Sequence, residues 1–320
     1  MKQYAVVMAV TLILAWVVER TYVVAPGSLA TKRKDRFFIV IIFIILALFI
    51  GLRRHYNDTY TYRQSYNAAL PFPAAWSQLD TTLAGHAGFQ TLVSLLKTVG
   101  ASEYTFLLVC ASLSLASAIW FLRKYSNHFV LTVFLFFATN TYLISAAAVK
   151  QSIAIAIGLL AIPFAVKKKW FLFTVLILVA ATFHLYILIY LLIPFLMFKP
   201  WEKRTYIMLI AFICAGFMLD SLLGTIIDIT TMIGENYEQE KFMGDGVNIF
   251  RVLVSNMPAI LTFIYKDKLF KTSTRTDHLM INLAILNGAI MFVGMMFAAG
   301  LKVWYWVTAF GAAVVAAPFA

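Results

Sequence analysis

The sequence FFIVIIFIILALFIGL at residues 37–52, followed directly by RRHYND at residues 53–58, decides the fold of this chain. The first stretch is a continuous apolar run, which predicts a membrane-spanning helix because a bilayer needs roughly 20 mostly apolar residues. The second stretch places two arginines and a carboxylate at the mouth of that helix. Ionisable groups at membrane depth are costly and usually functional. We therefore take residues 53–58 as the first candidate site.

The composition of the whole chain indicates the same class of protein. Of its 320 residues, 62% are hydrophobic and only 12% are charged, with a mean hydropathy of +0.86. A soluble domain is near half apolar and about a quarter charged. Cys110 and Cys214 lie inside apolar runs, which indicates small core side chains and not a disulfide or metal pair. We predict an all-α, polytopic membrane protein whose residues 1–320 form a single integral membrane domain.

About 11 segments are candidate spans by length and apolar content. They are residues 4–18, 37–52, 104–122, 129–145, 151–166, 170–183, 185–198, 206–227, 252–265, 279–298 and 303–319. The two segments on either side of His184 have an alternative interpretation as one long broken segment.

Lysine and arginine gather in every second loop between these segments. They are Arg20, Lys32, Arg33, Lys34, Arg36, Arg123, Lys124, Lys167, Lys168, Lys169, Lys199, Lys203, Arg204, Lys266, Lys268, Lys271 and Arg275. By the positive-inside rule these loops are cytoplasmic, which places the N-terminus outside and the C-terminus in the cytoplasm. The topology also accounts for the formal net charge of +12, so we expect no nucleic-acid partner.

Two long loops then lie outside the cell, at residues 53–103 and 228–251. In the first loop, Phe89, Leu92, Val93, Leu96 and Val99 follow helical spacing, which predicts an amphipathic helix on the outer surface. The second loop is acidic and contains three glycines, which is typical of a solvated, mobile segment.

Basic and titratable residues fall at the predicted outer ends of several helices. They are Arg53, Arg54, Lys150, His184 and Lys302. If the helices bundle, these residues converge on one outward-facing cavity. Arginine suits phosphate because its planar fork donates two bonds at once, and lysine supplies a point charge. Asp58 and His184 are the groups that can accept a proton.

Aromatic residues of the first loop are candidates for stacking on sugar rings. They are Tyr56, Tyr60, Tyr62 and Trp76. A polar site of this kind needs no metal and no cofactor if its basic residues neutralise a pyrophosphate.

Each of these assignments has a structural alternative. Arg53 and Arg54 can be interfacial anchors that reach lipid headgroups. Lys150 can mark the end of a span, and the aromatic residues can form an interfacial belt. His184 can be a structural histidine, and Asp58 can pair with an arginine or cap a turn.

Four segments, in this order along the chain, resemble segments of the EpsG family, which groups with the Wzy-type exopolysaccharide polymerases. GLRRHYNDTYTY (51–62) resembles its L-R…D-x-x-x-Y segment, GFQ (88–90) begins a similar amphipathic stretch, VKQSIA (149–154) resembles R-Q-x-x-A, and AATFH (180–184) resembles A-x-x-F-H. Lys150 replaces the family's arginine, and His86-Ala87 stands where members often have an acid. Lys302, before Trp304-Tyr305-Trp306, takes the place of a third family arginine.

The resemblance implies a polysaccharide polymerase of the bacterial cell membrane. Such a protein joins oligosaccharide repeat units, carried on undecaprenyl pyrophosphate, into exopolysaccharide, capsule or O-antigen on the outer face. Arg53, Arg54, Lys150 and Lys302 would bind the pyrophosphate, and His184 or Asp58 would activate the acceptor hydroxyl. His184 is favoured slightly, because two neighbouring arginines should make Asp58 a weak base. Membrane lipids and a chain-length regulator or other export proteins are the expected partners.

Two other classes of function stay open. A flippase or transporter of lipid-linked oligosaccharide would need charged residues at mid-span in several helices, and only Asp220 and Asp228 come near that position. A non-catalytic subunit of an export complex would tolerate loss of the basic residues. An integral membrane acyltransferase is a further enzyme class, and it would expect a His-Asp arrangement on a cytoplasm-accessible face.

Overall fold

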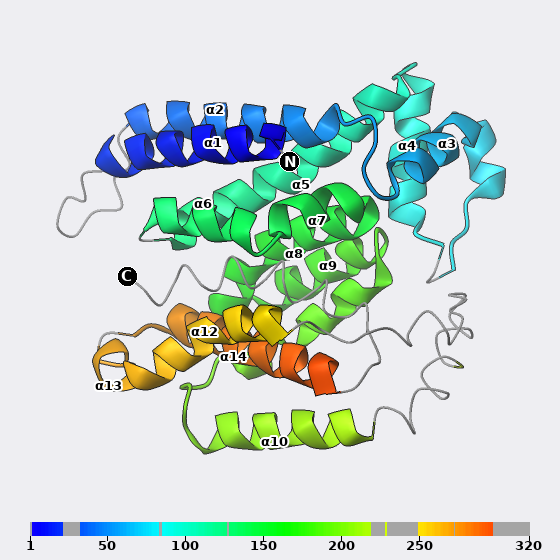
Figure 1. Cartoon of the computed structure of the whole chain (residues 1–320). Helices are drawn as coiled ribbons and strands as arrows, with labels where there is room; N and C mark the ends of the chain where they lie inside the picture. The colour runs from blue at the N-terminus through cyan, green and yellow to red at the C-terminus, as the bar shows by residue number, and fades with distance from the viewer. Residues whose placement is uncertain are drawn as a thin grey trace.

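The computed structural model describes residues 2–21, 33–82, 85–126, 128–218, 228, 249–271 and 273–296. Every regular element in these residues is a helix, which confirms the all-α prediction (Figure 1). Several of the predicted apolar runs coincide with helices, because a helix satisfies its own backbone hydrogen bonds in an apolar medium. Residues 229–248, which form most of the second predicted outer loop, lie outside the described residues, as does Lys302.

Helices α1 (Lys2–Thr21) and α2 (Arg33–Gly51) form an antiparallel pair, and α2 packs along α5 (Glu103–Tyr125) (Figure 1). The start of α5 is set locally, since the Ser102 hydroxyl accepts a hydrogen bond from the Thr105 backbone N–H. Its last turn carries Arg123 and Lys124, and their positive charges interact favourably with the negative end of the helix dipole.

The predicted span at residues 129–145 is divided into two helices, α6 (Phe129–Ala138) and α7 (Thr141–Ala147), bent by 51°. The bend lies at Asn140, whose φ of 63° is left-handed. Helix α8 (Val149–Val166) follows α7 at once and contributes many buried residues to the main hydrophobic core.

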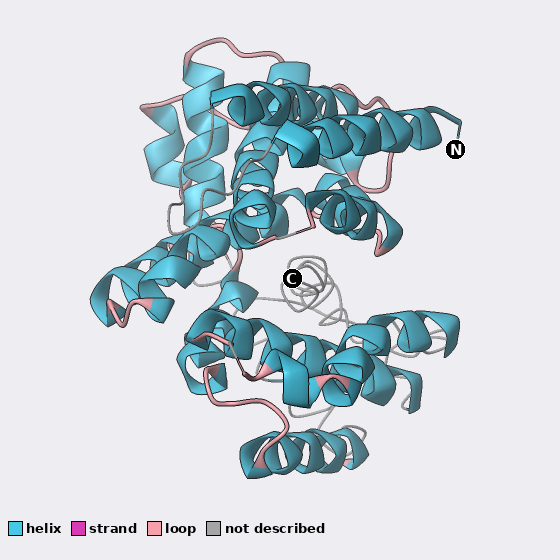
Figure 2. Ribbon diagram, turned by 90° about the vertical axis from the view of Figure 1, so that its left-hand side faces the viewer, coloured by secondary structure: helices cyan, strands magenta, loops and turns pink. Residues whose placement is uncertain are grey.

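The chain breaks again between α9 (Trp170–Ala181) and the 3₁₀ helix η2 (Leu185–Leu196), in the turn that contains His184. This break was anticipated from the sequence. Four further helices pack beyond η2: α10 (Lys203–Phe217), α12 (Ile249–Ile264), α13 (Lys266–Leu269) and α14 (Arg275–Met296) (Figure 2). The Asn282 amide on α14 holds η2 by donating to the Leu196 and Phe198 carbonyls.

Three short helices between α2 and α5 form a cap at one end of the bundle (Figure 1). They are α3 (Thr59–Ala68), η1 (Ala74–Gln78) and α4 (Ala87–Thr98). Helix α4 is the amphipathic helix expected from the sequence. Its Phe89 and Val93 are buried with Phe106 and Ile153, so this part of its apolar face packs on the protein.

Four of the described helices are long and apolar enough to cross a membrane, and α6 with α7 adds a fifth if the bent pair is one span. Helix α9 and η2 are apolar but shorter. The chain is therefore a membrane protein. The predicted number of about 11 spans is not reached by these helices, and the segment at residues 303–319 lies outside the described residues.

Candidate functional site

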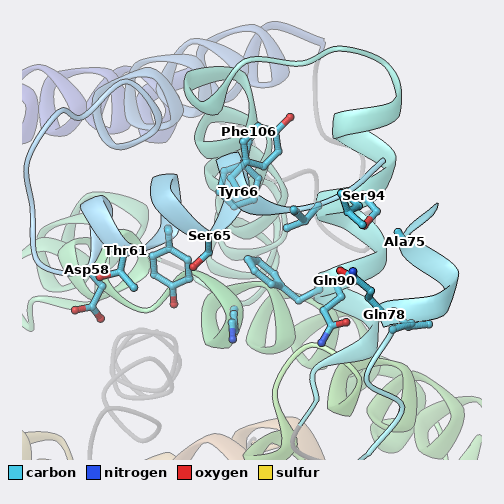
Figure 3. A pocket seen from close by; sticks show the side chains of 16 residues that line it. Asp58, Thr61, Ser65, Tyr66, Ala75, Gln78, Gln90, Ser94 and Phe106 are labelled. Carbon is cyan, nitrogen blue, oxygen red and sulfur yellow. The ribbon is translucent and has the colours of Figure 1, made fainter. Parts of the chain in front are cut away.

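A cavity of about 500 Å³ lies between the cap and the ends of α5 and α8 (Figure 3). It is lined by Asp58, Thr61, Tyr62, Ser65, Tyr66, Ala69, Leu70, Ala75, Gln78, Leu79, Phe89, Gln90, Val93, Ser94, Phe106 and Lys150. Figure 3 shows Asp58 and Thr61 at one end of the cavity and Gln78 with Gln90 at the other. Its wall thus combines aromatic and aliphatic side chains with hydroxyls, amides and one pair of opposite charges.

Lys150 reaches the cavity from the first turn of α8. Its ammonium lies 5.5 Å from the centre of the Phe89 ring, within range of a cation–π attraction. Tyr62 fixes this turn, because its hydroxyl accepts hydrogen bonds from the backbone N–H groups of Lys150 and Val149. Burial raises the pKa of Tyr62 to about 12, so the hydroxyl stays protonated at neutral pH.

Asp58 directly precedes α3 and is exposed on the wall of the cavity. Its side chain does not cap the helix, although its backbone carbonyl accepts from the Tyr62 N–H. Among the described residues no cation lies within ion-pair distance of this carboxylate. The structural alternatives of a cap or an arginine partner are therefore not realised in the described part of the chain.

The guanidinium of Arg53 forms hydrogen bonds to other groups of the protein. It donates to the Ile50 carbonyl at 2.6 Å, the Ala146 carbonyl at 2.6 Å and the Thr59 hydroxyl at 2.9 Å. These bonds join the end of α2, the start of α3 and the end of α7. Three of its five N–H groups are used in this way. Arg54, next in the chain, is exposed.

His184 lies in the turn between α9 and η2, within electrostatic range of Lys150. Its ring centre is 5.3 Å from that of His86, at the start of α4, and 5.2 Å from that of Tyr186. Burial lowers the pKa of His184 to about 3, with His86 and Lys150 acting in the same direction. The imidazole is therefore neutral at physiological pH. It can accept a proton there, but only as a weak base.

Helix α4 docks onto the same turn through Gly88. The Gly88 N–H donates to the Thr182 carbonyl at 2.9 Å. A Cβ atom at this position would lie 2.2 Å from the Thr182 hydroxyl oxygen, so only glycine allows this approach. The glycine of the GFQ segment thus has a packing role beside the site.

A network of hydrogen bonds holds the cap in place. Arg63 on α3 forms an ion pair with Glu103 on α5, and Asn67 donates to the same carboxylate. The Tyr66 hydroxyl donates to the Ala101 carbonyl at 2.6 Å, and its ring stacks on Phe106. The cavity wall is therefore well ordered before any ligand binds.

The structure brings together part of the predicted site. Asp58, Tyr62 and Lys150 line the cavity, and His184 lies outside its wall, within electrostatic range of Lys150. The other predicted aromatic residues Tyr56, Tyr60 and Trp76 are exposed and do not line it, and Lys302 lies outside the described residues. The roles proposed for all these residues stay predictions.

Sequence reasoning missed the neutral polar residues of the wall. They are Thr61, Ser65, Gln78, Gln90 and Ser94. Thr61 and Gln90 lie inside segments 51–62 and 88–90, but nothing in the sequence indicates that these five residues converge, because that depends on how the cap folds. Within the described residues, no three His, Cys, Asp or Glu side chains are grouped as a metal site would require.

Comparisons with known proteins identify the family. No curated protein matches the chain, and no solved structure does. The EpsG family model matches residues 36–319, which include the cap, the cavity and the turn at His184. This match covers most of the sequence, and the chain therefore belongs to the EpsG family.

Proposed function

We propose that this protein is a polysaccharide polymerase that works on the outer face of the bacterial cell membrane. It moves a growing glycan from undecaprenyl pyrophosphate onto the sugar of the next lipid-linked repeat unit. The observation that carries the proposal is the cavity between cap and bundle, with Asp58 and Lys150 on its wall, in a chain of the EpsG family.

The distribution of charge supports an outward-facing cavity. Helix α5 runs from the cap to Arg123 and Lys124, and α8 runs from Lys150 to the turn at Lys167. The basic turns thus lie at the far end of the bundle from the cap. By the positive-inside rule the basic end faces the cytoplasm and the cap faces outward.

The proposed reaction is a transfer at an anomeric carbon. The acceptor hydroxyl oxygen bonds to that carbon while its bond to the pyrophosphate oxygen breaks. The bonding electron pair leaves with the pyrophosphate, and the hydroxyl proton passes to a protein base, Asp58 or His184. Lys150 and Arg54 offset the charge that develops on the pyrophosphate. Arg53 contributes by holding the three helix ends that frame this region.

The test is polymer length in cells that carry single variants at matched protein levels. We expect Lys150→Ala and Asp58→Asn to reduce polymer output, by roughly 100-fold for the loss of a group that stabilises transition-state charge. Arg54→Ala and His184→Gln test the two remaining assignments. Lys97→Ala is the control, since this lysine belongs to the cap but does not line the cavity. Normal long polymer from all four site variants would overturn the proposal.

A further inference from the structure

We propose that the cavity is a subsite for an uncharged sugar unit, and that the carrier pyrophosphate lies outside it, beyond Lys150 and toward Arg54. The inference rests on the proposed function and adds which part of the substrate enters the cavity. It also assigns sugar contacts to Thr61, Ser65 and Gln78, none of which the sequence indicated.

The charge of the wall is the first argument. The lining residues include one carboxylate, Asp58, and one ammonium, Lys150. A pyrophosphate carries several negative charges and is bound by clusters of arginine and lysine. The cavity wall has one charge of each sign, so it lacks the excess of positive charge that would bind a pyrophosphate. Arg54, four residues before Asp58 in the chain, is exposed and does not line the cavity, so it offers additional positive charge outside it.

The neutral polar groups are the second argument. Thr61 and Ser65 project from α3, Gln78 comes from η1, and Gln90 comes from α4. Hydroxyl and amide side chains each donate and accept hydrogen bonds, which matches the hydroxyl groups of a sugar. Gln90 is already held, because its amide donates to the Gly85 carbonyl and accepts from the Asp80 N–H.

The aromatic wall is the third argument. Tyr62, Phe89 and Phe106 come from three different helices and line one cavity (Figure 3). The C–H face of a sugar ring is apolar and packs well on aromatic carbon, while its hydroxyls face the polar groups. A volume of about 500 Å³ lies within the usual range of small-molecule sites, roughly 300–1,000 Å³.

An isoprenoid chain is the competing occupant, and the wall argues against it. Thr61, Ser65, Gln78 and Asp58 are all exposed polar residues on the cavity wall. A lipid tail in the cavity would displace water from these polar side chains without forming hydrogen bonds to them. The ordered cap, held by Arg63 and Glu103, also suits a ligand that is recognised by fixed polar groups.

The experiment uses photo-crosslinking in living cells, so that the native glycan itself is the probe. Thr61→p-benzoylphenylalanine and Gln78→p-benzoylphenylalanine place the crosslinker in the cavity. Gln64→p-benzoylphenylalanine and Ser77→p-benzoylphenylalanine are matched controls on the same two helices, exposed and outside the cavity. All four positions are exposed, so the variants should fold, and membrane abundance checks this.

After irradiation, the purified protein is analysed for attached sugar and attached lipid by mass spectrometry. We expect sugar-containing adducts at positions 61 and 78 and none above background at 64 and 77. Lipid without sugar at 61 and 78, or no adduct at either, would overturn the inference. Polymer production in the parent strain and in a strain without the gene is measured in parallel. Polymer that persists without the gene would instead refute the proposed function.

Discussion

Basic residues at the two ends of the helix bundle differ in their contacts with the protein. At the cap end, Arg53 and Arg63 are bound to protein acceptors. At the far end, marked by α13 in Figure 1, Lys167, Lys168 and Lys169 are all exposed. The difference separates two uses of positive charge in one membrane protein. One end uses it to hold the cap in place, and in the proposed topology the other end faces the cytoplasm.

The cap end therefore depends on individual contacts, whereas the far end depends on total charge. A single change at the cap should alter stability or activity. A single change in a basic turn should do little, because exposed ion pairs and isolated surface charges contribute small energies. The following predictions test this contrast.

The largest effect on stability is expected from Arg53→Lys. A lysine ammonium cannot reach the Ile50 and Ala146 carbonyls and the Thr59 hydroxyl together, as the guanidinium does. We expect a loss of about 3 kcal/mol in the free energy of unfolding, from hydrogen bonds that involve a charged donor. Thermal unfolding of the detergent-purified protein measures it. Arg54→Lys is the matched control, and equal unfolding temperatures for both variants would contradict this role.

A smaller loss is expected from Gly88→Ala. The new methyl group would meet the Thr182 side chain and the Phe183 ring, which forces α4 away from the turn at His184. Overpacking of this kind costs about 2 kcal/mol. Thr182→Ala in the same protein removes the nearest atom and should restore part of the stability. If Gly88→Ala unfolds at the wild-type temperature, then α4 does not dock closely on this turn.

The pH dependence of stability should come partly from His184. Its pKa is lowered to about 3 in the folded protein, so the unfolded chain binds more protons below pH 6.5. This contribution to stability is complete above pH 6.5 and is lost as the pH falls toward 3. The loss at pH 5.5 is about 1 kcal/mol. Unfolding temperatures between pH 7.5 and 5.5 should fall less steeply for His184→Gln than for the wild type, and identical slopes would show that this histidine is not buried.

The smallest effect is expected at the basic end. Replacing Lys167, Lys168 and Lys169 together with glutamine should change the free energy of unfolding by less than about 0.5 kcal/mol, because all three side chains are exposed. Thermal unfolding checks this directly. A loss as large as that of Arg53→Lys would remove the contrast between the two ends.

The sequence was sufficient to predict several long helices and the amphipathic helix α4, but not how the cap packs. Apolar runs located α2, α5 and α8 within a few residues, because hydrophobicity and the lack of water in a bilayer determine such helices locally. The cap depends on contacts between distant residues, such as the stacking of Tyr66 on Phe106. Periodicity carries no information about these contacts.

The candidate site shows the same limit. Lys150 and Asp58 stood out because charged residues are rare in this chain, and both line the cavity. The use of Arg53 could not be predicted, since its partner at Ala146 is a backbone carbonyl 93 residues away. Gln78 is a common surface residue type, and only the fold of the cap brings it to the cavity.

We propose that this protein polymerises lipid-linked repeat units at the outer face of the membrane. The most direct measurement is the set of lipid-linked glycans that accumulate when its gene is deleted. We expect single repeat units on the carrier, exposed at the outer face, and long polymer again when the wild-type gene is restored. Accumulation confined to the cytoplasmic face would indicate a flippase and contradict the proposed function.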